Sequence, residues 1–240
     1  MSSLRGRRFK IALIICGTIL AFILVLVSPF FSVTHIVIQG NARVSQSDIR
    51  ERLGNPGNIF MLNTRQARDR IMGNLYIGDV TFRRDFPDRL YVTVFERRLS
   101  AYVFHMGNYL YLDDFGRVLE VRSYISEARP VLQGLDFQRW QLGEVLEVAN
   151  DIDFAAVVLY TQLLSTHGLI YSISHINVSD PSNIRILVNY LDFHVGGVMD
   201  ADEKVRTMKE ILNELPDAAR MRGFVNLQQI QPLFFLELLQ

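Results

Sequence analysis

The feature that constrains this chain most is an uncharged apolar run near its N-terminus. The run begins at Ile11, ends at Phe31 and contains 21 residues without one Asp, Glu, Lys or Arg. At about 1.5 Å per residue, a helix of this length spans the roughly 30 Å hydrocarbon core of a bilayer. A buried core helix is the alternative, but core helices of this length usually carry a polar stripe. The run therefore predicts a transmembrane helix over residues 11–31.

Basic residues before the run set its orientation. Residues 1–10 contain no acid and four basic side chains: Arg5, Arg7, Arg8 and Lys10. Lys and Arg that flank a membrane span stay in the cytoplasm. We therefore expect a cytoplasmic basic tail over residues 1–10 and a single membrane span. Most of the chain, from residue 32 onward, is expected outside the cytoplasm.

A cleaved signal peptide is the other interpretation of this N-terminus. Signal peptides have a shorter apolar region and small residues before the cleavage site. Here Pro29 would follow a cut after Ser28, and Phe30 would occupy a small-residue position for a cut after Ser32. These residues favour an uncleaved anchor in the cell membrane.

Charge and cysteine content exclude several classes of protein. Four of the 25 basic residues precede the apolar run, which leaves 21 basic and 25 acidic residues after it. A nucleic-acid-binding chain is usually basic, so we expect no nucleic-acid partner. The single cysteine, Cys16, lies inside the run and excludes a disulfide within the chain.

Residues 32–98 carry the pattern of a small β-α-α-β-β domain. A β-branched stretch ends at Gly40, and Ser45 opens a helix with a capping-box pattern. Thr64 is expected to cap a second helix. Two strands follow, over residues 79–82 and 90–96, with alternating apolar residues in the second.

Residues 99–240 predict an α+β domain with an antiparallel sheet. Hairpin patterns come first, and two helices follow over residues 153–166 and 200–215. Asp200 is expected to cap the second helix. A last strand is predicted over residues 223–230, and the tail after it is too apolar to remain uncovered in water.

Signatures of catalysis and metal binding are missing from the sequence. The five histidines share no metal-ligand spacing, and no nucleotide-binding or nucleophile motif occurs. Asp113 and Asp114 are adjacent, a spacing that serves a turn better than paired acid-base chemistry. We therefore expect no enzyme, no metal, no cofactor and no small-molecule substrate.

Two surfaces remain as candidates for recognition. The basic residues Arg83, Arg84, Arg89, Arg97 and Arg98 would bind an anionic lipid or polymer, or would decorate the solvent face of paired strands. The last strand, near the chain end, is a candidate sheet edge that could accept a strand of another protein.

Three motifs then resemble one family. Residues 84–98 (RDFPDRLYVTVFERR) resemble the end of the POTRA domain in the cell-division proteins FtsQ and DivIB. Residues 36–41 (IVIQGN) resemble that domain's first strand and turn, and residues 111–118 (YLDDFGRV) the hairpin that opens the following β domain. Leu99 departs from the family pattern, which often has proline there.

The resemblance implies a non-enzymatic scaffold of the divisome, located in the cell membrane at the division septum. Its implied partners are bitopic FtsB/DivIC-like and FtsL-like division proteins, bound by strand addition. The implied contact residues are Phe224, Val225, Asn226, Leu227 and Gln228. Asn226 and Gln228 stand where the family has a charged pair, so the polar contacts would differ.

Two other classes are compatible with parts of the pattern. One is a POTRA-bearing protein of outer-membrane transport or assembly, and the other is a membrane-tethered envelope hydrolase. The sequence leaves open the type of envelope, the stoichiometry of the complex, and whether the apolar tail packs on its own domain or on a partner.

Overall fold

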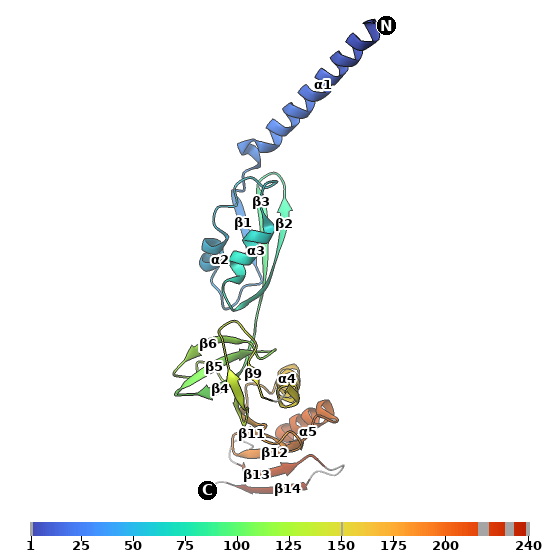
Figure 1. Cartoon of the computed structure of the whole chain (residues 1–240). Coiled ribbons are helices and arrows are strands. Elements are labelled where there is room, and N and C mark those ends of the chain that lie inside the picture. Colours follow the sequence, from blue (N-terminus) through green and yellow to red (C-terminus); the bar gives the residue numbers. More distant parts are fainter. Residues whose placement is uncertain (1, 150, 216–220, 229–232, 239–240) are drawn as a thin grey trace. The chain divides into compact units, whose positions relative to one another are not determined.

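The computed structural model describes residues 2–149, 151–215, 221–228 and 233–238 (Figure 1). Within these segments, the side chains of residues 2–12, 151–153, 221, 234 and 237–238 lie outside the description. The chain divides into two units, Met1–Glu96 and Arg97–Gln240, and each has a hydrophobic core of its own.

Helix α1 (Ser2–Val27) contains most of the apolar run, and a 3-10 turn, η1 (Pro29–Phe31), follows it. The α-helix ends before the run does because Pro29 disfavours the helical conformation at Ser28. The Ser28 hydroxyl instead accepts a hydrogen bond from the Phe30 amide. No helix in the described part of the chain is long and apolar enough to qualify as a membrane span.

The predictions for the N-terminal residues fall partly outside the described residues. Arg5, Arg7, Arg8, Lys10 and Ile11 lie in α1, but their side chains are outside the described residues. Within α1 the side chains are described from Leu13 onward, and most of its large apolar ones are exposed.

The first unit continues with two helices and three strands in the predicted β-α-α-β-β order. These are β1 (His35–Gln39), α2 (Gln46–Leu53), α3 (Thr64–Met72), β2 (Ile77–Asp85) and β3 (Arg89–Glu96). Strand β3 is central: β1 runs parallel to it and β2 antiparallel. In β3 the odd and even side chains alternate between the core and the surface, as a strand with one covered face requires.

The two helix starts differ in how well the sequence predicts them. The Ser45 hydroxyl accepts a hydrogen bond from the Asp48 amide, as predicted. The expectation for Thr64 is wrong by one residue, because Asn63 is the cap and its side-chain oxygen accepts from Gln66. Both helices bury apolar side chains, such as Leu53 and Ile71, against the sheet.

The second unit contains a nine-stranded sheet within the described residues, two helices and a separate two-stranded hairpin. Its strands are β4 (Leu99–His105), β5 (Asn108–Asp113), β6 (Val118–Arg122), β7 (Val131–Gln133), β10 (Ile173–Asn177), β11 (Ile184–Val188), β12 (Leu191–Gly196), β13 (Met221–Asn226) and β14 (Leu233–Leu238). The hairpin is β8 (Phe137–Arg139) with β9 (Glu147–Val148), and the helices are α4 (Asp151–Thr166) and α5 (Ala201–Glu214).

The prediction of an antiparallel sheet holds for five of the described strand pairs, but the sheet as a whole is mixed. Its order is β14-β13-β12-β11-β10-β7-β4-β5-β6. The pairs β4–β7, β7–β10 and β12–β13 are parallel. Parallel neighbours need long crossover connections, and α4 and α5 lie in two of them, between β7 and β10 and between β12 and β13.

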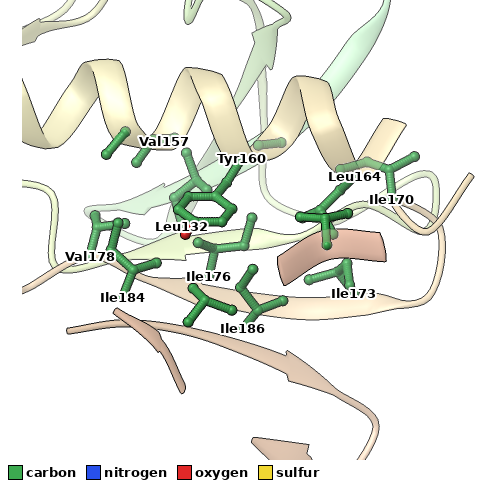
Figure 2. Close-up of a cluster of buried hydrophobic side chains, with 14 of the residues drawn as sticks. Leu132, Val157, Tyr160, Leu164, Ile170, Ile173, Ile176, Val178, Ile184 and Ile186 are labelled. Carbon is green, nitrogen blue, oxygen red and sulfur yellow. The ribbon is translucent and has the colours of Figure 1, made fainter. Parts of the chain in front are cut away.

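Helix α4 covers the centre of this sheet. Figure 2 shows Val157, Tyr160 and Leu164 pointing from the helix toward Ile176 and Ile186 of the sheet. The Tyr160 hydroxyl donates a hydrogen bond to the Gly197 carbonyl at 2.9 Å. Burial raises the pKa of Tyr160 to about 12, so the phenol is neutral at physiological pH and can donate.

Helix α5 contributes Val205 and Met208 to the same core. The expectation that Asp200 caps this helix through its side chain is wrong. Asp200 is left-handed, with φ of 54°, and its side chain makes no capping hydrogen bond. In that conformation its carboxylate is not directed at the first-turn amides.

Candidate partner interface at the C-terminal sheet edge

Strand β13, which was expected to be a sheet edge, has a neighbour on both sides. It runs parallel to β12 and antiparallel to β14. The expectation is therefore wrong, and the reason lies in the apolar tail. The backbone amides and carbonyls of residues 233–238 need hydrogen-bond partners, and those on the side that faces β13 find them there. Within the described residues the tail thus packs on its own domain.

The side chains of β13 alternate between two faces. Val225 is fully buried, and Leu227, just past the strand, also belongs to the core. Phe224 points away from that core and is 39% exposed. The predicted contact residues therefore do not form one surface, because neighbours in a strand point to opposite sides.

The two polar residues of the predicted set, Asn226 and Gln228, form hydrogen bonds at the C-terminal end of β13. The Asn226 side-chain oxygen accepts a hydrogen bond from the Gln228 amide at 2.9 Å. The Gln228 side chain donates to the Asn183 side-chain oxygen at 2.8 Å. Asn226 is half-buried and Gln228 is exposed. Both hydrogen bonds are thus made within the second unit, from Gln228 to Asn226 and from Gln228 to Asn183.

Three stacked rings cross the outer face of this end of the sheet. We call His194, Phe224 and Phe235 the aromatic ladder, because one ring comes from each of β12, β13 and β14. The first two ring centroids lie 5.4 Å apart and the last two 6.0 Å apart, with interplanar angles of 23° and 18°. Sequence reasoning found only Phe224. His194 and Phe235 are brought beside it by strand pairing, which a local pattern does not report.

Strand β14 is the edge of the sheet. It is the terminal strand in the sheet order, and its sequence, LFFLEL, carries one charge, at Glu237. Leu233 and Phe235 are exposed, Phe235 by 62%. Natural edge strands are usually protected by lysine, proline or a bulge. The described strand β14 contains no lysine or proline and pairs with β13 without a bulge, so this largely apolar edge is suited to accept another strand.

Gly223 allows β14 to lie this close. Its φ is +154°, and a Cβ there would lie 1.8 Å from the Phe235 carbonyl oxygen. Only glycine leaves room for that approach. The edge strand therefore depends on one residue in the middle of β13.

Asp113 and Asp114 serve their own hairpin turn. The buried Asp113 carboxylate accepts hydrogen bonds from the Phe115 and Arg117 amides and pairs with Arg97 at 3.2 Å. Asp114 accepts a hydrogen bond from Ser100. Across the part of the chain that the structure describes, no group of His, Cys, Asp and Glu side chains could hold a metal ion.

The basic cluster predicted from sequence is divided between the two units. Arg83 lies over the Tyr91 ring at 3.9 Å, and Arg84 donates to the Leu62 carbonyl, both in the first unit. Arg97 belongs to the second unit and pairs with Asp113. The five arginines thus do not act as a single patch of one domain.

Comparison with known families identifies the class of the first unit. Residues 31–97 match the family model described as a POTRA domain, FtsQ-type. The β-α-α-β-β unit is therefore a POTRA domain, and the resemblance seen in the sequence motifs is confirmed.

The relatives extend this likeness over the second unit. Cell division protein DivIB of Clostridium tetani is 24% identical over 214 residues, covering 87% of this chain and 81% of that protein. Cell division protein FtsQ of Syntrophotalea carbinolica is 34% identical over 116 residues, 46% of this chain and 40% of its own. This chain is a homologue of the DivIB and FtsQ cell-division proteins.

One solved structure is similar to part of this chain. It is the major extracytoplasmic domain of DivIB from Geobacillus stearothermophilus, which matches 51% of this chain and 97% of its own length. The identity is 19% and the TM-score is 0.33.

Proposed function

We propose that this protein is a non-enzymatic scaffold of the divisome, in the manner of FtsQ and DivIB. It recruits FtsB/DivIC-like and FtsL-like bitopic proteins to the septum through its extracytoplasmic domains. The names of the relatives, all cell division proteins, support this role over outer-membrane transport and over envelope hydrolysis.

The single observation that carries the proposal is the unprotected edge strand β14. A partner strand that adds to β14 would gain main-chain hydrogen bonds along an edge already aligned by β13. Phe235 and Phe224 of the aromatic ladder would supply apolar contact beside it. In this arrangement the partner protein contacts β14. The role of β13 is to hold β14 in place, together with the residues at its end: Val225, Asn226, Leu227 and Gln228.

The same proposal includes a membrane anchor. The apolar run over residues 11–31 is long enough to cross a bilayer, and the large side chains between Leu13 and Val27 are mostly exposed. Basic residues before the run favour a cytoplasmic N-terminus. The chain is then a single-pass protein whose POTRA and β domains lie outside the cytoplasm.

Depletion of the protein in its native cell tests the cellular role. We expect filaments that lack septa, because a divisome without its scaffold does not assemble partner proteins at midcell. Expression of the full-length chain should restore septation. Normal division during verified depletion would contradict the proposal.

A pull-down with the FtsB/DivIC-like partner tests the interface. We expect Phe235→Lys to reduce binding at least tenfold, because a charge replaces an apolar contact of about 1.4 kcal/mol or more. Phe104→Lys is the matched control, since Phe104 is a similarly exposed phenylalanine on β4 of the same sheet. Equal binding by the two variants would remove β14 from the proposal.

A further inference from the structure

Four phenylalanines gather at one end of the POTRA unit. Phe30 and Phe31 come from the turn after α1, Phe60 from the loop before α3, and Phe86 from the β2–β3 turn. Successive ring centroids lie 5.1, 5.0 and 4.9 Å apart. We call these four residues the Phe cluster.

The Phe cluster is open to its surroundings although it is apolar. Phe30 is 67% exposed and Phe86 55% exposed, and Phe60 and its neighbour Met61 are exposed as well. A soluble domain normally buries aromatic rings that contact one another, and contiguous exposed apolar surface usually marks an interaction site.

Hydrogen bonds fix the Phe cluster to the end of α1. The Asn58 side chain donates to the Leu26 carbonyl of α1 at 2.8 Å. The Ile59 amide donates to the Phe31 carbonyl at 2.8 Å. The loop that carries Phe60 and Met61 therefore lies at the level where the apolar helix ends.

The β2–β3 turn reaches the same end because of the strand register. His35 at the start of β1 is paired with Arg89 at the start of β3. The Thr34 amide also donates to the Asp88 carbonyl at 3.0 Å. Phe86 is thereby held beside the residues that follow α1, and its ring stacks on Phe60 at 22°.

The charges around the Phe cluster suit a negatively charged surface. Arg84 and Arg89 are exposed near this end of the hairpin. Two acids lie between them. Asp88, in the turn, is engaged by Thr34 and His35, and Asp85, at the end of β2, lies opposite Arg89 in the strand pairing. Exposed arginines beside apolar side chains favour contact with anionic lipid headgroups.

From these observations we propose that the Phe cluster and Met61 insert into the interface of the bilayer that α1 crosses, and hold the POTRA unit against the membrane. The inference depends on the membrane anchor of the proposed function. Lipid is the occupant because the cluster is covalently continuous with α1: Phe30 follows Val27, the last helical residue, after two residues. Aromatic side chains at the ends of membrane spans commonly lie at this depth.

A fluorescent probe at Met61 tests the proposal in the full-length chain. Cys16→Ala removes the native thiol, and Met61→Cys supplies one for an NBD label. Ala42→Cys is the matched control, because Ala42 is also exposed but lies past the far end of β1. Both proteins are reconstituted into vesicles of phosphatidylethanolamine and phosphatidylglycerol, with and without lipid spin-labelled near the headgroup.

We expect a blue-shifted emission at residue 61 that spin-labelled lipid quenches, and an unquenched, water-like emission at residue 42. Phe60→Ser should reduce the blue shift at residue 61, because Phe60 contacts both Phe31 and Phe86. Vesicle flotation separates the two proposals. Protein that floats with water-like emission at residue 61 would overturn the insertion alone, and protein that does not float would overturn the anchor together with it. A blue shift that spin-labelled lipid leaves unquenched would mean that protein covers the cluster, and would also overturn the inference.

Discussion

At Glu96 a single carboxylate closes the turn that follows β1. Its two oxygens accept hydrogen bonds from the amides of Ala42, Arg43 and Val44, at 3.0, 2.8 and 2.9 Å. A charged acceptor satisfies three amides that no strand or helix pairs, and such charge-assisted bonds are stronger than neutral ones. Glu96 belongs to the motif that resembles FtsQ and DivIB, and its described contacts give the residue a structural role within the POTRA unit.

The close contact at Gly223 predicts that a single added methyl group destabilises β14. We expect Gly223→Ala to lower the free energy of unfolding of the second unit by about 1–3 kcal/mol, since the new Cβ would meet the Phe235 carbonyl and strain the backbone. Hydrogen exchange should accelerate at the amides of residues 233–238. Gly107→Ala is the control: φ is +81° there, but nothing lies within 4 Å of the added Cβ. If β14 stays as protected in Gly223→Ala as in the control, the close approach does not govern the edge.

Between elements, a small polar network joins β1 to the β2–β3 turn. The Thr34 hydroxyl donates to the Asp88 carboxylate, and the His35 ring nitrogen lies 2.9 Å from the same oxygen. The hydrogen bond from Thr34 first, and that from His35 second, hold the pKa of Asp88 below its usual value. The network also keeps the turn that carries Phe86 beside the end of α1.

This network predicts a pH dependence. Because the pKa of Asp88 is lower in the folded state than in the unfolded chain, its stabilising contribution is present above the unfolded pKa of about 4 and is lost as the pH falls through the folded pKa. We expect Thr34→Val to move the pKa of Asp88 back toward its ordinary value. Thr34→Ser retains the hydroxyl and should keep the pKa low. Carboxyl-detected NMR titration measures both variants, and identical titrations would exclude Thr34 as the main cause.

At the scale of the whole molecule, the two units have separate hydrophobic cores. The POTRA core is built from residues of the first unit, such as Leu53, and the larger core from residues of the second, such as Leu191. Both leucines are fully buried. Each unit therefore buries its own apolar surface on folding.

One leucine substitution in each core should show whether the two units unfold independently of each other. We expect Leu53→Ala and Leu191→Ala each to cost about 2–5 kcal/mol, because each leaves a cavity in a close-packed core. Hydrogen exchange on the full-length chain in detergent should show lost protection only in the unit that carries the substitution. Equal loss of protection in both units would mean that they unfold together.

Local patterns in the sequence determined the elements of the POTRA unit and the family of the chain. The order of its strands and helices, and the cap at Ser45, depend on periodicity and on neighbours a few residues apart, which are readable along the chain. The motif over residues 84–98 carried the family resemblance, and residues 31–97 match the corresponding domain.

Only the tertiary structure decided which strand forms the edge of the second sheet. Strand pairing is made by backbone groups that every residue shares, so the sequence indicated strands without their neighbours. It could not indicate that Phe235 would stack on Phe224, or that β13 would run parallel to β12. The sequence predicted the partner interface on β13, and the structure places the exposed edge on β14. The pairing of β14 with β13, and the space that Gly223 leaves for it, form only when the chain folds.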